Sequence, residues 1–386
     1  MRIAIVGGGP AGLFFAYLMK RHDRAHDVRV FERDAEGATY GWGVVFSDVA
    51  LAFVREVAPE LYASITRTQQ VFDTMRIVHR GQVVTLANNT FHRMARIDLL
   101  RALHAHCRDA GVAIAFGERI DDVARFDDCD LVVAADGANS SVRRRFAAHF
   151  EPTLDVRPNK LAWYGTTRLF DPLSLIFRQN DDGLVIAHAY RYSETHSTFL
   201  VECDPATWRR AGLDRMSEAE SLAYCERAFA EDLAGEPLLS NRSDWFNYAI
   251  VKNRRWHTDR VALLGDALRT GHPSVGSGTR LAMQDSIALF DAARVHAHDV
   301  PAMLVEFERI RRPGSDALQE AAIRSAEWYE NLGPKLALDP VSFAYDYLTR
   351  TGRVTHDDVR KRDPALAAAW EALHAGHAAP AGNARC

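Results

Sequence analysis

The sequence predicts a mixed α/β fold in which a parallel sheet is interrupted by a mostly antiparallel sheet and followed by helices. Three observations predict it. Apolar strand patterns alternate with helical patterns near the start of the chain and return near residue 260. Between about 156 and 255, strands follow one another closely and are separated by turn signals. From residue 301 onward, apolar residues recur at helical spacing.

The first element is a strand, a glycine loop and a helix. Residues 3–6 are apolar and mostly β-branched, which predicts a buried strand, and residues 13–20 have a helical pattern. Gly7, Gly9 and Gly12 form G-x-G-x-x-G between them. The three glycines suit, in turn, a tight turn, a pyrophosphate close to the backbone, and close packing of the helix on the sheet. Alone, this motif is a weak signal, and a glycine-rich turn without a ligand is the alternative.

The second strand strengthens the first signal. It ends at Glu32, 20 residues after Gly12, which is the spacing of a ribose-binding carboxylate. Residues 1–33 therefore predict a Rossmann-like β-α-β unit that binds a dinucleotide.

Further elements lead from this unit to the insertion. They are a glycine-rich loop over 37–48, a helix over 48–57 with Asp48 as its N-cap, a hairpin over 75–86, a helix from 96 to 107, and strands over 112–116 and 130–135. The last strand ends in Asp136 and Gly137, at the edge where α/β sheets bind ligands.

The insertion has strand and helix signals of its own. On its third strand, Ile186, His188 and Tyr190 share one face because side chains alternate along a strand. The predicted elements are strands over 163–169, 174–178, 184–192 and 198–203 and a helix over 216–233.

After the insertion the first pattern returns. A strand over 261–264 ends in Gly265-Asp266, and the glycine loop 271–278 precedes a helix over 279–296. Two such loops predict a cofactor held at both ends. The predicted domains are 1–155 with 256–300, which bind the cofactor, then 156–255 for substrate, and a helical region over 301–386 that ends in a loose tail.

Composition excludes several classes. A net charge of -4 offers no basic surface for nucleic acid. Five scattered cysteines without C-x-x-C predict neither a disulfide framework nor a zinc site, and we expect no metal and a reducing cytoplasm. Residues 2–19 have some signal-peptide character, but glycines and a proline break the apolar run, so we expect folded structure there and no membrane span.

The order of these motifs resembles the single-component flavin-dependent aromatic hydroxylases of the para-hydroxybenzoate hydroxylase type, from residue 1 to about 330. Residues 40–48, 159–165, 187–193 and 197–203 are similar to one branch of that family. The branch contains salicylyl-CoA 5-hydroxylase, 2-aminobenzoyl-CoA monooxygenase and the violacein-pathway hydroxylase VioD, so these stretches mark a branch and not one substrate.

The resemblance implies FAD and assigns positions to it. These are Gly7, Gly9, Pro10, Ala11, Gly12 and Arg96 at the pyrophosphate, Glu32 and Arg33 at the adenosine ribose, Asp136 at the strand edge, Gly265 and Asp266 at the ribityl chain, Pro273 near the reactive edge of the flavin, Gly278 and Thr279 at its N1/O2 edge, and Trp42, Gly43 and Val44 beside the ring. The family's Gly-Asp-Ala-Ala-His ends here in Arg269, which puts the role of that histidine in doubt.

The reaction implied by the family uses NADH or NADPH to reduce FAD and O2 to form a flavin C4a-hydroperoxide, which hydroxylates an aromatic ring. The candidate proton carriers are His272, His188 and Tyr190; the candidate pocket residues are Phe177, Ile186, His188, Tyr190 and Pro273. For each proton carrier the alternative is a buried residue with a satisfied hydrogen bond, and for Phe177 and Ile186 it is core packing. The arginines at 143–145 predict either an anion site or a solvated face.

The substrate predicted first is an aryl-CoA thioester such as salicylyl-CoA, hydroxylated at position 5. An indole or other natural-product intermediate is the alternative, kept open because we expect no reductase-like second module of the kind fused to some CoA-acting relatives. Two other classes stay open on the residues alone: an FAD-dependent oxidase or reductase without oxygen insertion, and a nucleotide-binding protein without activity. We expect a monomer or homodimer.

Overall fold

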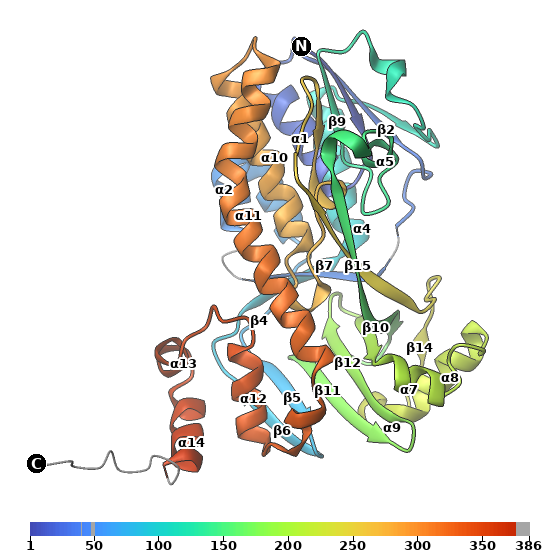
Figure 1. Cartoon of the computed structure of the whole chain (residues 1–386), viewed down its shortest axis with the longest axis vertical. Helices are drawn as coiled ribbons and strands as arrows, with labels where there is room; N and C mark the ends of the chain where they lie inside the picture. Colours follow the sequence, from blue (N-terminus) through green and yellow to red (C-terminus); the bar gives the residue numbers. More distant parts are fainter. Residues whose placement is uncertain (40, 48–50, 376–386) are drawn as a thin grey trace, which may run out of the picture.

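A computed structural model describes residues 1–39, 41–47 and 51–375 of the chain. It contains a parallel sheet, a large mixed sheet, a small antiparallel sheet and the helices that cover them (Figure 1). The predicted N-cap Asp48 and the predicted tail from residue 377 lie outside the described residues.

The parallel sheet confirms the predicted β-α-β unit and its returning strand. Its order is β16-β9-β1-β2-β8, and every pairing in it is parallel. Ile3 pairs with Val28 on one side and with Leu131 on the other. The central strands β1 and β9 and the edge strand β16 are buried and almost entirely apolar, as parallel strands covered on both faces usually are, whereas Arg29 interrupts the apolar run of β2. The bounds are β1 (Arg2–Val6), β2 (Asp27–Glu32), β8 (Ala113–Phe116), β9 (Leu131–Ala134) and β16 (Val261–Leu263).

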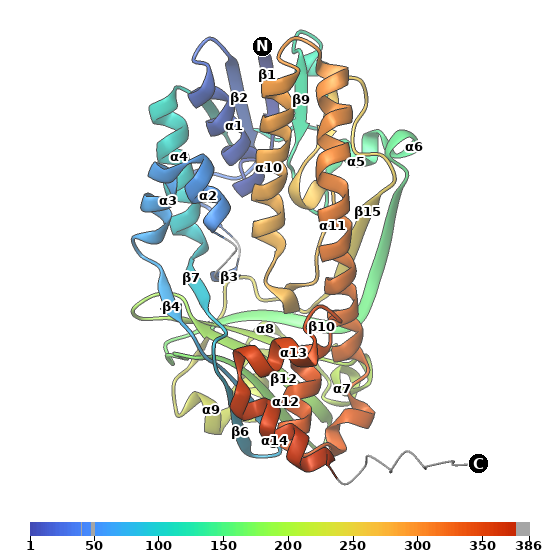
Figure 2. The same ribbon diagram turned by 90° about the vertical axis from the view of Figure 1, so that its left-hand side faces the viewer.

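Helices lie side by side in one layer that covers the parallel sheet. α4 packs on α1, α1 on α10, and α10 on α11, which lies farthest from α4 (Figure 2). The bounds here are α1 (Pro10–His22), α2 (Ala52–Val57), α3 (Pro59–Thr66), α4 (Arg96–Ala110), α5 (Ser141–Arg145), α6 (Ala147–Phe150), α10 (Gly278–Val295) and α11 (Val300–Glu330), with short 3-10 helices η2 (Val123–Phe126), η3 (Gly265–Ala267) and η4 (Pro273–Val275).

The mixed sheet contains the predicted inserted strands and one further hairpin. Its order is β14-β10-β13-β12-β11-β5-β6, and β15 pairs with β10. β5 joins β11 in parallel, so the hairpin over 75–86 belongs to this sheet although it lies far earlier in the chain. The bounds are β5 (Met75–His79), β6 (Gln82–Leu86), β10 (Pro152–Thr166), β11 (Leu173–Asn180), β12 (Gly183–Arg191), β13 (Ser197–Cys203), β14 (Leu238–Leu239) and β15 (Phe246–Asn253).

Two of the predicted elements differ in extent. The strand predicted over 163–169 is the end of the longer strand β10, which begins at Pro152 and stops at Thr166. The helix predicted over 216–233 is two helices, because buried Phe229 leaves the helical backbone with φ -116° and ψ 25°. The helices on this side of the sheet are α7 (Pro205–Arg210), α8 (Glu218–Ala228) and α9 (Ala230–Leu233).

The small sheet carries the glycine-rich loop. Its central strand β7 pairs with β3 and β4 in antiparallel register, and Gly43 lies opposite Ala95. The bounds are β3 (Gly43–Ser47), β4 (Gln70–Phe72) and β7 (Phe91–Ala95).

Helix α11 joins the two large sheets. It runs from the parallel sheet to the mixed sheet, and its last turns contact η4 and β10 (Figures 1 and 2). Trp328 and Tyr329 near its end pack with Phe343 against one face of the mixed sheet, whose other face packs against α8 and α9. The remaining elements are η5 (Gly333–Ala337), α12 (Pro340–Thr349), α13 (His356–Arg362) and α14 (Pro364–His374).

The described part of the chain has neither a membrane-spanning helix nor a metal-binding cluster. None of its helices is long and apolar enough to cross a membrane. No group of its His, Cys, Asp and Glu side chains is placed to hold a metal ion.

A buried ion network holds the returning loop to the helices. Arg269, at the position of the family histidine, donates two hydrogen bonds to Asp285 of α10, from Nη1 at 2.7 Å and Nη2 at 2.6 Å. Arg311 of α11 donates its Nε–H to the same carboxylate at 2.7 Å. The side chains of Arg269 and Asp285 are 3% and 0% exposed. Arg269 therefore connects the loop after β16 with both helices.

Breaking this network should lower the free energy of unfolding of the protein. We expect Arg269→Met to lower the free energy of unfolding by about 3 kcal/mol, because it leaves a buried carboxylate with half of its cationic partners. Arg309→Met, which removes a surface pair with Glu306, is the control and should leave stability unchanged. Urea unfolding followed by circular dichroism measures both; equal midpoints would contradict the role given to Arg269.

Candidate active site

A crevice opens at the carboxyl edge of the parallel sheet. The loops after β1, β2 and β9 and the start of α4 line it, so stretches far apart in the sequence meet at one place. The predicted cofactor residues among its lining are Gly7, Gly9, Glu32, Arg33, Arg96 and Asp136. Pro10, Ala11 and Gly12 are buried behind the first loop, in the first turn of α1.

The three glycines of the first motif have different surroundings, as their spacing predicts. Gly7 has φ +107°, and a Cβ there would lie 2.3 Å from the Ala135 carbonyl oxygen. A Cβ on Gly12 would lie 2.3 Å from the Gly7 carbonyl oxygen. A Cβ on Gly9 would meet nothing within 4 Å. The loop therefore packs tightly at Gly7 and Gly12 and leaves open space at Gly9, in front of the N-terminus of α1, where a pyrophosphate fits.

Glu32 is held against the same loop. Its Oε2 accepts a hydrogen bond from the Gly8 N–H at 2.7 Å, and its Oε1 accepts one from the Asp34 N–H at 2.9 Å. Each carboxylate oxygen keeps a second lone pair, so ribose hydroxyls can still donate to it. Arg33 lies beside it in the crevice wall.

An unsatisfied carboxylate oxygen of Asp136 is separate evidence that a ligand fits the crevice. Its Oδ2 accepts hydrogen bonds from Ser141, at 2.7 Å from the backbone N–H and 3.1 Å from the hydroxyl. Its Oδ1 is buried and has no partner in the described chain. Buried acceptors are normally satisfied, so this atom indicates a missing donor such as a cofactor hydroxyl. The hydroxyls of Thr39 and Ser277 are unsatisfied in the same way, and no sequence signal pointed to them.

Arg96 and Asp266 extend the site away from the first loop. Burial lowers the pKa of Arg96, and the nearby charge of Asp266 opposes that shift. Asp266 is accessible to solvent, yet desolvation by the surrounding protein raises its pKa against the opposing charges of Arg96 and Arg269. Tyr248 is close by and donates its hydroxyl proton to the Gly271 carbonyl at 2.9 Å.

The turn after β16 packs directly on the first turn of α1. Gly265 has φ +59°, and a Cβ there would lie 2.9 Å from the Cβ of Ala11. Gly278 and Thr279 form the first turn of α10, and a Cβ on Gly278 would meet nothing within 4 Å. Pro273 begins η4 and is half-buried. The open N-terminus of α10 suits the electron-rich edge of a flavin.

The loop at Trp42 and Gly43 is clamped between the sheets. The Trp42 ring covers Gly165, where a Cβ would lie 2.7 Å from ring atoms, and its Nε1–H donates to the Trp163 carbonyl at 3.3 Å. The Gly43 N–H donates to the Thr198 hydroxyl at 3.0 Å. Val44 follows and is buried in the core of the parallel-sheet domain.

Tyr190 completes this clamp. Its hydroxyl donates to the Gly43 carbonyl at 2.9 Å, and burial raises its pKa to about 12. A hydroxyl group that already donates its proton in a hydrogen bond, and whose pKa is raised, suits a structural role. Proton transfer by Tyr190 stays a prediction, and the geometry favours the alternative of a satisfied hydrogen bond.

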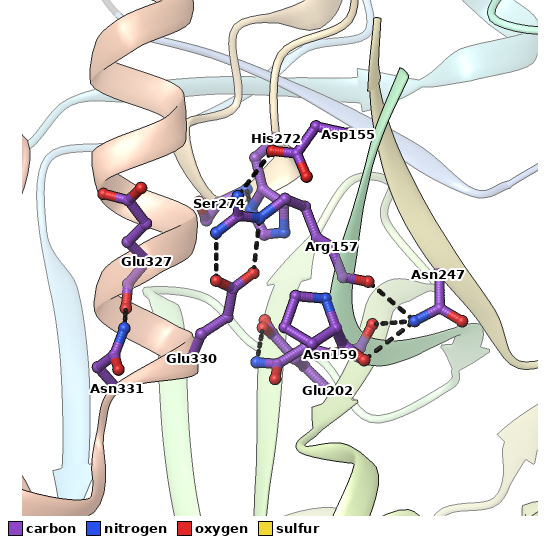
Figure 3. A network of polar contacts seen from close by, with 11 residues as sticks. Asp155, Arg157, Asn159, Glu202, Asn247, His272, Ser274, Glu327, Glu330 and Asn331 are labelled. Carbon is purple, nitrogen blue, oxygen red and sulfur yellow. Dashed lines mark hydrogen bonds and ion pairs between the residues drawn. The ribbon is translucent and has the colours of Figure 1, made fainter. Parts of the chain in front are cut away.

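His272 is buried at the junction of η4, α11 and the mixed sheet (Figure 3). Its Nδ1 lies 2.8 Å from the Ser274 hydroxyl, which lies 2.7 Å from the Ser325 hydroxyl on α11. The side chain is 1% exposed, and burial lowers its pKa to about 4. His272 is therefore neutral near pH 7.

His188 faces a carboxylate that the sequence reasoning missed. Its Nε2 lies 3.1 Å from Oε2 of Glu202, whose Oε1 accepts a hydrogen bond from Asn159 Nδ2 at 2.8 Å. Burial opposes ionisation of Glu202, but the hydrogen bond and charge of His188, with help from His272 and Asn159, hold its pKa below the ordinary value. Glu202 occupied an inward position in a predicted strand, and a buried acid in a strand was the one available signal.

The other predicted pocket residues pack in a hydrophobic cluster. Phe177 lies edge-on to Phe343 with ring centroids 4.8 Å apart and parallel to Tyr329 at 6.5 Å. Ile186, its cross-strand partner, is buried in the same cluster. The structure brings both close to His188, and their contacts favour core packing.

The arginine run at 143–145 has separate roles. Arg143 is 3% exposed and donates from Nη1 to the Ala267 carbonyl at 2.9 Å, so it supports the second loop and forms no surface charge. Arg144 lines the crevice and donates to the Asn139 carbonyl at 2.7 Å.

A Rossmann-type crevice, a second glycine loop at a helix N-terminus and an inserted mixed sheet together define a flavin-dependent monooxygenase. Residues 1–322 match the FAD binding domain family, and the chain belongs to that family. It is an FAD-dependent aromatic monooxygenase, which uses NAD(P)H and O2 as co-substrates.

Three relatives carry this assignment. The chain is 38% identical to a salicyloyl-CoA 5-hydroxylase of Streptomyces over 91% of this chain and 70% of that protein. It is 33% identical to the protodeoxyviolaceinate monooxygenase of Chromobacterium violaceum over 91% and 94%. It is 34% identical to a 3-hydroxy-4-methyl-anthranilyl-[aryl-carrier protein] 5-monooxygenase of Streptosporangium sibiricum over 93% and 97%. The branch suggested by the sequence is confirmed, and both non-monooxygenase classes are set aside.

Solved structures share the fold. The tetrameric form of 2-methyl-3-hydroxypyridine-5-carboxylic acid oxygenase superposes with a TM-score of 0.71 at 19% identity, covering 93% of this chain and 95% of that one. This likeness confirms the predicted mixed α/β architecture.

Filling the open space at Gly9 should remove FAD without unfolding the protein. Gly9 has φ -79°, which a side chain tolerates, so Gly9→Val should keep the melting temperature of the FAD-free protein. We expect FAD affinity to fall at least about tenfold, or about 1.4 kcal/mol. Gly333→Val, also in open space but outside the crevice, is the control. Flavin absorbance after gel filtration measures the effect; full retention of FAD by Gly9→Val would count against this site.

His272 should make the fold sensitive to acid. An unfolded histidine titrates near 6.5 and His272 near 4, so the unfolded chain binds more protons between these values. Stability should therefore fall by about 3 kcal/mol as pH falls from about 6.5 to about 4. His272→Asn keeps an acceptor for Ser274 and should weaken this dependence, whereas His196→Asn, on the turn before β13, should not. Urea midpoints across this range measure it, and identical pH dependence in all three proteins would refute the assignment.

Proposed function

We propose that this monooxygenase hydroxylates the aromatic ring of an acyl group attached to CoA, with salicylyl-CoA and its position 5 as the specific case. The observation that carries the proposal is the similarity of nine-tenths of the chain to a salicyloyl-CoA 5-hydroxylase at 38% identity. A second relative has a name that places an aromatic acyl group on a carrier protein, which supports a substrate with a large carrier.

The proposed FAD contacts are distributed along the crevice, starting at the first glycine loop. Gly9 and the N-terminus of α1 would hold the pyrophosphate with Arg96, whose planar, permanent charge suits it. Glu32, with Arg33 beside it, would bind the adenosine ribose, and Asp136 and Asp266 would accept hydrogen bonds from cofactor hydroxyls. The N-terminus of α10 at Gly278 and Thr279 would face the flavin, with Pro273 near its reactive edge.

When bound, FAD supplies the redox chemistry that takes electrons from NAD(P)H and places one oxygen atom of O2 on the ring. The chain's own residues position the reactants and exclude water. The clamp of Trp42 and Gly43 closes one side, and the wall formed by His188, His272 and Tyr329 closes the other. A closed site limits the wasteful release of peroxide.

A second substrate class is an indole or other natural-product aromatic. The similarity to protodeoxyviolaceinate monooxygenase favours it, because that match covers 94% of the relative's length. The two substrate classes differ in the carrier, so a CoA thioester and a free bicyclic ring separate them in one experiment.

We also propose a cytoplasmic enzyme that works as a monomer or homodimer, with domains bounded at residues 155, 255 and 300. Four buried, unpaired cysteines, Cys107, Cys129, Cys203 and Cys225, support a reducing compartment. Light scattering of the purified protein tests the oligomeric state.

Substrate identity is tested with the purified holoenzyme. We expect salicylyl-CoA to accelerate NADH or NADPH oxidation at least about tenfold and to gain one oxygen at position 5, because substrate triggers flavin reduction in a well-controlled site. Free salicylate and indole-3-acetate are the comparison substrates. Product mass and peroxide are measured together. Hydroxylation of the indole alone would favour the second class, and NADH consumption with peroxide as the sole product would refute the proposed substrate.

A further inference from the structure

Three of the stretches that mark the branch meet in one buried cluster. Asn159 comes from the stretch over 159–165, His188 from 187–193 and Glu202 from 197–203. Their side chains form one hydrogen-bonded series, from Asn159 to Glu202 and from Glu202 to His188. Nothing in the FAD crevice requires this series, so it needs an explanation of its own.

An irregularity in β10 aims Asn159 into the cluster. The pairing of β10 with β15 shifts between Val156 and Lys160. Asn247 of β15 spans the shift, and its Nδ2 donates to the backbone carbonyls of residues 157–159 at 2.9, 3.0 and 3.2 Å (Figure 3). Such bulges redirect side chains and are enriched next to active sites.

The bulge also anchors the cluster to α11. Arg157 donates its Nε–H to Glu330 Oε1 at 2.9 Å, and its Nη2 binds the other oxygen of the same carboxylate (Figure 3). Their side chains are 13% and 9% exposed. A two-point ion pair of this kind fixes geometry more firmly than a single contact.

Glu202 determines which nitrogen of His188 carries the proton. The carboxylate is 1% exposed and, when ionised, only accepts hydrogen bonds. His188 must therefore donate from Nε2, which leaves Nδ1 as an acceptor in the neutral ring. No hydrogen bond within the described residues involves Nδ1, and the His188 side chain keeps 11% of its surface exposed.

The charged and titratable groups around His188 come from several elements that meet at this junction. Glu202 lies on β13, and the Tyr329 ring of α11 lies 5.0 Å from the His188 ring between centroids. His272, which precedes η4, interacts electrostatically with both His188 and Glu202. The next shell of charge consists of Arg157, Glu330 and Arg350. His188 thus lies on the side of the site where Pro273 would meet the flavin.

We propose that His188 is the base that takes the proton of a phenolic hydroxyl on the aromatic substrate, and that Glu202 and Asn159 are positioning residues for it. This rests on the proposed function and narrows its substrate to rings that carry a hydroxyl. The substrate O–H bond breaks, the proton binds Nδ1, and the electron pair stays on oxygen and enriches the ring for attack. Glu202 stabilises the resulting imidazolium through Nε2–H. When the ring regains aromaticity, the hydrogen on the hydroxylated carbon leaves as a proton, which balances the proton taken up by the oxygen atom that stays with the oxygen donor. His188 returns its own proton to the substrate oxygen, so the protein ends unchanged.

The kinetic test uses holoenzyme and salicylyl-CoA. His188→Gln should bind FAD and undergo flavin reduction like the wild type, but form product about 10²–10⁴-fold more slowly and divert NAD(P)H oxidation into peroxide. Glu202→Gln should lower the rate and move the acidic limb of its pH profile to lower pH, because the carboxylate no longer favours the imidazolium. His196→Gln is the control. Wild-type product rates across pH in His188→Gln would overturn the proposal.

A second measurement is independent of turnover. In holoenzyme labelled with ¹⁵N-histidine, the signals of the neutral His188 ring, identified by their absence in His188→Gln, should show a protonated Nε2 and a bare Nδ1. A protonated Nδ1 in that neutral ring would overturn the proposal. If wild-type enzyme fails to hydroxylate salicylyl-CoA but shows a bare Nδ1, the proposed substrate fails and the placement of the base survives.

Discussion

The contact between the turn after β16 and the first turn of α1 is the constraint on which the site depends. Gly265 approaches Ala11 so closely that a side chain on Gly265 would lie 2.9 Å from the Ala11 Cβ. The contact brings residues about 250 positions apart together and places Asp266 near Arg96, beyond the first loop. Arg143 and the Arg269–Asp285 pair hold the second loop from behind. The contact therefore brings residues of the turn after β16 to the loop after β1, as two anchors for one cofactor require.

The mixed sheet uses its two faces differently. One face packs on α8 and α9 and is apolar, as expected for a core. The other face meets the end of α11, and there a hydrophobic cluster gives way to the polar series of Asn159, Glu202 and His188. Buried polar groups are costly unless satisfied, so their concentration at this one junction indicates function more than stability. The hydrogen bond from Tyr190 to Gly43 ties this face to the loop at Trp42 and Gly43.

Local signals predicted several of the residues that line the crevice. The first glycine loop, Glu32 and Asp136 each lie at the end of a short apolar strand, where sequence spacing and structure coincide. The sequence did not indicate Glu202 as a site residue, because its contact with His188 depends on strand register. Glu202 lies opposite Ile186, and His188 is its diagonal neighbour. The hairpin over 75–86 was predicted as an element, but its pairing with β11 is a long-range choice that no local pattern encodes. The structural role of Arg269 likewise follows only from its contact with Asp285, which no local pattern predicts.

The central claim is that this crevice and this sheet together place one atom of O2 on an aromatic ring. The most direct measurement is turnover of salicylyl-CoA by the holoenzyme under ¹⁸O2, followed by mass spectrometry of the product. The structure predicts one ¹⁸O atom in the new hydroxyl group and none from labelled water. A product without the label, or label found in hydrogen peroxide alone, would contradict it.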